Sequence, residues 1–61
     1  MINEIIQYFG GQRELANVLQ ISEAAISIWK RQGVPPGRAI EIEIKSNGVF
    51  KAVEIIRDAN I

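Results

Sequence analysis

The spacing of small and apolar residues from Gly11 to Arg31 is the feature that most restricts how this chain can fold. Apolar residues repeat at helical spacing in residues 12–19 and again in residues 22–31, so each segment has one apolar side. Ala16 places a small side chain where two such helices can cross, and Ile21 lies in the short turn between them. A helix-turn-helix needs a small residue at the crossing, apolar facing sides and a tight turn, so the segment predicts this motif.

A further helix is expected on the amino-terminal side of the motif. Its apolar residues fall at the first, fourth, fifth and eighth positions of one helical stripe, and they are Ile2, Ile5, Ile6 and Phe9. Gly10-Gly11 then ends the pattern.

The segment from residue 39 to residue 56 fits two different secondary structures. The isoleucines at positions 40, 42 and 44 alternate with charged residues, and Asn47-Gly48 is a strong hairpin signal, so a β-hairpin is one interpretation. Pro35-Pro36 is equally typical of a helix start, and Asn47-Gly48 of a helix stop, before a second helical pattern from Val49 to Ile56. Periodicity alone therefore leaves two folds open: an all-α domain of five short helices, or three helices followed by a β-hairpin.

Composition limits the chemistry open to these 61 residues, which have room for a single small domain over residues 1–61. The chain has no cysteine and no histidine, so thiolate or imidazole metal ligands and a nucleophile–histidine pair are excluded. Glu41 and Glu43 alternate with apolar residues and lack an organising partner, so we expect a solvated face there. We expect neither an enzyme nor a protein that holds a metal, a cofactor or a small-molecule substrate.

No segment of the sequence looks suited to a membrane. The amino terminus lacks a basic region before its apolar stretch, and Glu4 lies inside that stretch. No apolar run approaches the roughly 20 residues that span a bilayer. We therefore expect a cytoplasmic protein with no membrane partner.

Charge is unevenly distributed along a chain whose formal net charge is zero. Between residues 21 and 38, Lys30, Arg31 and Arg38 stand against Glu23 alone. A locally basic patch can therefore exist on a neutral molecule, so the zero net charge does not exclude a nucleic-acid partner.

These motifs together resemble the Cro family of phage repressors and the related Cro/YdaS-like prophage helix-turn-helix regulators. The resemblance covers almost the whole chain and is carried by Phe9-Gly10, Gln12-Arg13, Ala25-Ile26-Ser27-x-Trp29-Lys30, Val34-Pro35, Arg38-Ala39-x-x-Ile42-Glu43 and Asn47-Gly48. One position departs from the family pattern, because Gln20 stands where the turn usually has glycine. A non-glycine residue in a left-handed conformation there costs on the order of 1 kcal/mol.

The resemblance also bears on the fold, since some members of this family end in a β-hairpin and others in additional helices. The link from Gln32 to Pro36 and the pattern that follows it match the helical members. We therefore expect an all-α fold of five short helices, with the hairpin from about 39 to 56 as the alternative.

The family implies a sequence-specific repressor whose recognition helix, about residues 22–31, reads the major groove of a pseudo-palindromic operator in double-stranded DNA. The residues expected to face base edges are Ser22, Glu23, Ala24, Ser27 and Ile28. The residues expected to contact phosphates are Gln12, Arg13, Lys30, Arg31 and Arg38. Trp29 aligns with the apolar side and is expected in the core. Such a protein would work in the cytoplasm of a bacterial host, at its nucleoid.

With so few cations a single copy should bind DNA weakly, so we expect a weak homodimer, formed either in solution or only on DNA. The expected self-association segment is residues 49–61, with Phe50, Ile55 and Ile56 as dimerisation candidates. The alternative function is a protein-interaction module, such as a toxin–antitoxin or prophage accessory component built on the same scaffold. Glu23 on the reading face and the zero net charge favour that alternative.

Overall fold

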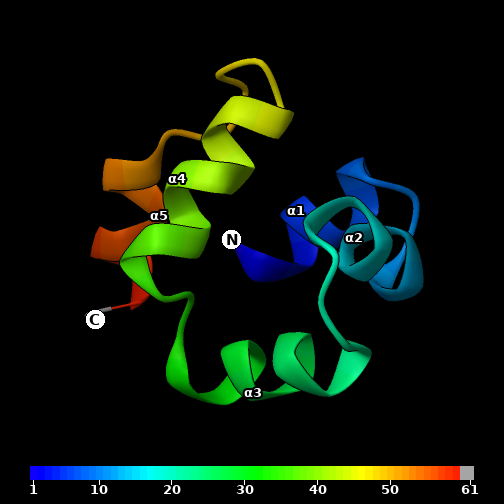
Figure 1. The fold of residues 1–61 in the computed structure, drawn as a ribbon. Coiled ribbons are helices and arrows are strands. Elements are labelled where there is room, and N and C mark those ends of the chain that lie inside the picture. Colours follow the sequence, from blue (N-terminus) through cyan, green and yellow to red (C-terminus); the bar gives the residue numbers. More distant parts are fainter. Residues whose placement is uncertain (60–61) are drawn as a thin grey trace.

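The computed structural model describes the backbone of residues 1–59 and the side chains of residues 1–57, and in this part the chain is helical without any strand. The helices are α1 (Ile2–Tyr8), α2 (Gln12–Leu19), α3 (Glu23–Gln32), α4 (Pro36–Lys45) and α5 (Ala52–Ala59). Figure 1 shows α2 on one side of the molecule, α4 and α5 on the other, α3 closing one end, and α1 in the middle. The expected all-α fold of five helices is confirmed, and the β-hairpin alternative is wrong.

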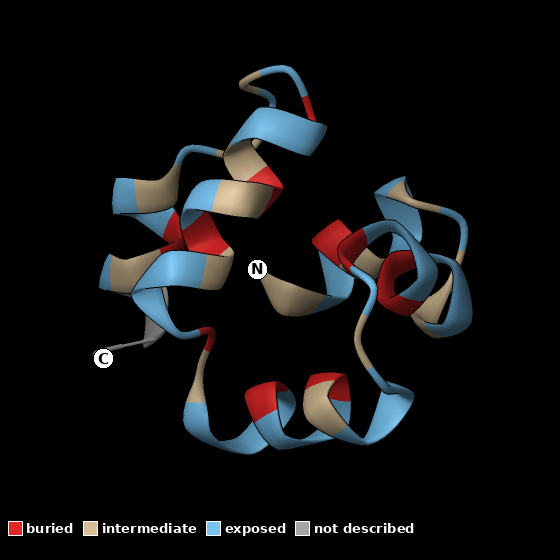
Figure 2. Ribbon diagram, in the orientation of Figure 1, coloured by how far each residue is buried: buried red, intermediate tan, exposed pale blue. Residues whose placement is uncertain are grey.

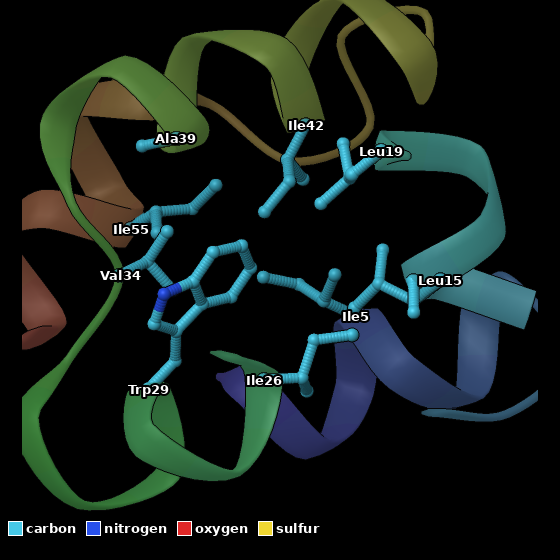
Figure 3. Packing of buried hydrophobic residues seen from close by; sticks show 10 residues of the cluster. Ile5, Leu15, Leu19, Ile26, Trp29, Val34, Ala39, Ile42 and Ile55 are labelled. Atoms are coloured by element: carbon cyan, nitrogen blue, oxygen red, sulfur yellow. The ribbon is translucent and has the colours of Figure 1, made fainter. Parts of the chain in front are cut away.

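All five helices contribute to one core. The apolar side of each helix faces inward and is buried, while the outer sides are exposed (Figure 2). Figure 3 shows side chains from every helix converging on the same space, among them Ile5, Leu15, Trp29, Ile42 and Ile55. Because so small a domain has few apolar residues to bury, each of them carries a large share of the stability.

The isoleucines of α4 show why this segment is a helix. Ile42 is fully buried, whereas Ile40 is 53% and Ile44 is 67% exposed. In a strand the three side chains would share one face, but at 100° per residue only Ile42 points at the core. Pro36 is the first residue of α4, where its missing N–H leaves no helical hydrogen bond unmade.

Two non-glycine residues adopt the left-handed conformation, one directly after α2 and one shortly after α4. Gln20 has φ 58° at the end of α2, and Asn47 has φ 55° after α4. The next residue closes each helix end, since Ile21 N–H donates to the Ala16 carbonyl over 2.9 Å and Gly48 N–H donates to the Glu43 carbonyl over 2.9 Å. These bonds satisfy carbonyls that a helix end otherwise leaves free. The unfavourable turn expected at Gln20 is therefore present and is closed by the backbone.

The junction between α4 and α5 depends on two polar side chains. Ser46 is fully buried; its hydroxyl donates to the Glu43 carbonyl and accepts from Phe50 N–H, each over 3.2 Å. The carboxylate of Glu43 accepts from Ala52 N–H over 2.7 Å, at the first residue of α5. The expectation that Glu43 lies on a solvated face is therefore wrong, because its carboxylate satisfies a free N–H at the start of α5.

Candidate nucleic-acid interface

Helices α2 and α3 form the helix-turn-helix expected from the sequence. The facing sides are buried, with Ala16 at 3% exposure between them and Ile26 fully buried on α3. Ser22 precedes α3, and its hydroxyl accepts from Ala25 N–H over 3.2 Å. This N-cap defines where α3 begins after the turn that joins it to α2.

A side-chain contact also joins the two helices on the outside. The amide nitrogen of Gln12, the first residue of α2, donates to the Glu23 carbonyl over 3.0 Å and to the Ser27 hydroxyl over 2.9 Å. The sequence led us to expect Gln12 among the phosphate contacts. Its hydrogen bonds to Glu23 and Ser27 were not expected. Periodicity could not reveal them, because the contact joins two separate helices.

The five residues expected to read bases lie together on α3 or at its start. All five are exposed: Ser22, Glu23, Ala24, Ser27 and Ile28. The side chain of Ile28, the bulkiest apolar one among them, is 42% exposed. None of them contributes to the core, so the outer side of α3 is open to a partner. Contact with DNA bases stays a prediction for all five.

The predicted phosphate-contacting cations divide into two groups. Arg13, near the start of α2, and Lys30 and Arg31, in the last turn of α3, are exposed and take part in no ion pair with another described residue. Arg38 is half-buried at the start of α4, and its guanidinium pairs with the carboxylate of Glu41. Among the described residues, the three cations at the two ends of the motif thus have no ion-pair partner, whereas the charge of Arg38 is partly offset by Glu41.

The comparisons with known proteins agree with this geometry. A family model described as DNA-binding transcriptional regulator Cro matches residues 2–60. The chain belongs to the Cro family. It is 41% identical over 51 residues to the regulatory protein cro of Salmonella phage P22, a match that covers 84% of this chain and 82% of the relative. No solved structure gives a significant match.

Membership of the Cro family decides between the function classes left open by the sequence. The family is one of DNA-binding transcriptional regulators and not a class of enzymes, and it does not favour the protein-interaction alternative. Among the described residues, no group of acidic side chains is arranged to hold a metal ion. Within the same part of the chain, no helix is long and apolar enough to cross a membrane.

The dimerisation candidates of this Cro-family protein lie mostly in its own core. Ile55 is 2% exposed, and Phe50 and Ile56 are partly buried against the core. The Phe50 ring also packs edge-on against Tyr8, with 5.3 Å between the ring centroids. Exposed aliphatic side chains lie nearby instead, and they are Ile40, Ile44, Val49 and Val53. Residues 58–61 of the expected self-association segment lie outside the described side chains.

Proposed function

We propose that this Cro-family protein represses transcription by placing α3, its recognition helix, in the major groove of a pseudo-palindromic operator in the cytoplasm of a bacterial host. The observation that carries the proposal is the outer side of α3, where five side chains are exposed. Exposed cations accompany them in the last turn of the same helix, Lys30 and Arg31, and near the start of α2, Arg13. Short or polar side chains can approach base edges, and unpaired cations can neutralise phosphates. The proposal thus assigns specificity to the five exposed side chains on the outer side of α3, and a salt-dependent share of the affinity to the three cations.

A salt titration separates the two roles. Arg31→Ala should weaken binding to every duplex by a similar factor and make the slope of log affinity against log salt shallower by about 1, since one phosphate contact is lost. Ser27→Ala should leave that slope unchanged and alter preference at one operator position. The measurement is fluorescence anisotropy with a selected operator and a mixed-sequence duplex at two salt concentrations.

Two results would contradict the proposed function. One is no DNA binding by the unaltered protein at low salt; the other is binding that does not depend on sequence. If Arg31→Ala and Ser27→Ala had the same effect on all duplexes, the assignment of α3 faces would be wrong.

We further propose that two copies bind one operator and contact each other through α4 and the start of α5. Ile40 and Ile44 are one turn apart on α4, Val49 and Val53 are four residues apart around the start of α5, and all four are more than half exposed. Helices α4 and α5 pack on each other, so these side chains belong to one part of the molecule. Burying them against a second copy removes apolar surface from water and doubles the number of phosphate contacts.

A pair of opposite substitutions tests this surface. Ile44→Glu and Ile44→Lys should both leave the fold intact, because Ile44 is exposed, and both should abolish cooperative binding to a two-half-site operator. Binding to a single half-site should change only slightly and with opposite sign for the two charges. Unchanged cooperativity in both variants, measured by band-shift titration, would show that the copies meet elsewhere.

A further inference from the structure

The orientation of the Gln12 side chain is determined by the carbonyl it faces. A backbone carbonyl can only accept hydrogen bonds, so the Gln12 atom 3.0 Å from the Glu23 oxygen must be the amide nitrogen. The second amide hydrogen is directed to the Ser27 hydroxyl at 2.9 Å. Both side-chain hydrogens of Gln12 are thus used within the protein, and its remaining oxygen cannot donate to a phosphate. The side chain of Gln12 is therefore a positioning group, and the phosphate contact expected at Gln12, which its backbone N–H at the start of α2 would have to make, stays a prediction.

The same two bonds restrict the hydroxyl of Ser27. As a residue inside α3, Ser27 gives its backbone N–H to the Glu23 carbonyl, four residues earlier. That carbonyl also accepts from Gln12, so both of its lone pairs are occupied. A serine hydroxyl inside a helix commonly donates to the carbonyl three or four residues earlier, but the Ser27 hydroxyl donates to neither carbonyl here. Among the described residues the Ser27 hydroxyl serves only as an acceptor, which leaves its own hydrogen free on an exposed side of α3.

We infer that Gln12 makes Ser27 a hydrogen-bond donor toward DNA, so that Ser27 selects a base which presents an acceptor in the major groove. The acceptors available there are N7 of either purine, O6 of guanine and O4 of thymine, whereas cytosine presents an amino donor. The inference rests on the proposed function, in which α3 enters the groove. It adds that a residue of α2, without touching a base, determines which hydrogen-bonding group α3 offers at one operator position.

The first test uses the unaltered protein and changes the DNA. An operator is first selected from a random pool with the unaltered protein. Comparison with Ser27→Ala then identifies the operator position at which base preference is lost. The expected loss is about fivefold, as for one neutral hydrogen bond. At that position, analogues remove one acceptor at a time: 7-deazapurines for N7, 2-aminopurine for guanine O6 and 5-methyl-2-pyrimidinone for thymine O4. One of them should weaken the unaltered protein about fivefold and leave Ser27→Ala unaffected.

The second test changes Gln12. Gln12→Met keeps the length of the side chain but removes both donors, so preference at the Ser27 position should fall about fivefold, with no further loss when Ser27→Ala is added. Gln12→Glu offers only acceptors, so it should turn the Ser27 hydrogen inward and shift preference toward a base that presents an amino donor. Arg13→Ala, at the next position, serves as the control and should weaken all operators alike. Circular dichroism confirms that each variant is folded.

The outcomes separate this inference from the proposed function. If the unaltered protein selects no sequence, the proposed function fails. If it selects an operator but the Ser27-dependent position requires a cytosine amino group, or Gln12→Met leaves preference there unchanged, the inference about Gln12 is overturned and the proposed function stands.

Discussion

Replacing Trp29 with alanine is expected to lower the free energy of unfolding by about 3–5 kcal/mol, which is most of the stability of a domain this small. Trp29 is 6% exposed, and its ring lies among Ile5, Val34 and Ile55, between α3 and the opposite side of the core (Figure 3). Truncation would leave a cavity that rigid neighbouring helices could not fill. Urea unfolding followed by far-ultraviolet circular dichroism measures the loss, since the variant has no tryptophan left to report by fluorescence.

The neighbouring residue is the matched control for Trp29. Ile28→Ala removes an apolar side chain from the same turn of α3, but Ile28 is exposed, so the change should cost less than about 0.5 kcal/mol. Ile28→Ala should therefore remain folded and show its effect only in operator preference. If Trp29→Ala were as stable as the unaltered protein, the indole would not belong to the core, and stacking on DNA would become the better explanation of this residue.

Replacing Ile42 with alanine is expected to cost about 2–5 kcal/mol, because a fully buried side chain would leave a cavity between α4 and the rest of the core. The same substitution at Ile44 should cost less than about 0.5 kcal/mol, since that side chain is mostly exposed. Thermal unfolding of both variants, at protein concentrations low enough to keep single copies, measures the difference. Equal losses would mean that the two side chains share one face, as they would in a strand.

Much of the helix-turn-helix that forms the candidate interface could be predicted from the sequence, because its signals are local. The helix-turn-helix follows from apolar spacing within α2 and α3, and Ser22 was recognisable as a cap by its residue type and position. Membership of the Cro family likewise followed from motifs that are contiguous in the chain. The exposed positions of α3 then follow from helical geometry once its apolar side is known.

The remaining features depend on contacts between distant residues. The phosphate contact expected at Gln12 came from its position at a helix start, which is visible in the sequence, whereas the bonds from its side chain to α3 are not. Ile55 looked like surplus apolar surface, but the packing of α5 on α4 buries it. Glu43 was expected to be solvated, but the turn between α4 and α5 places the first N–H of α5 against its carboxylate.

The sequence by itself determined the helix-turn-helix and the family, because both are encoded in the spacing of residues within single helices. For residues 39–56 the family resemblance favoured the helix, but the periodicity of the sequence left helix and hairpin open, since the same isoleucines satisfy either, and the tertiary structure decided between them. The core offers one inward position to Ile42 and none to Ile40 or Ile44, which selects the helix. It was likewise the packing of α2 against α3 that brought Gln12 to Ser27, because a hydrogen bond between two helices exists only once both have been placed.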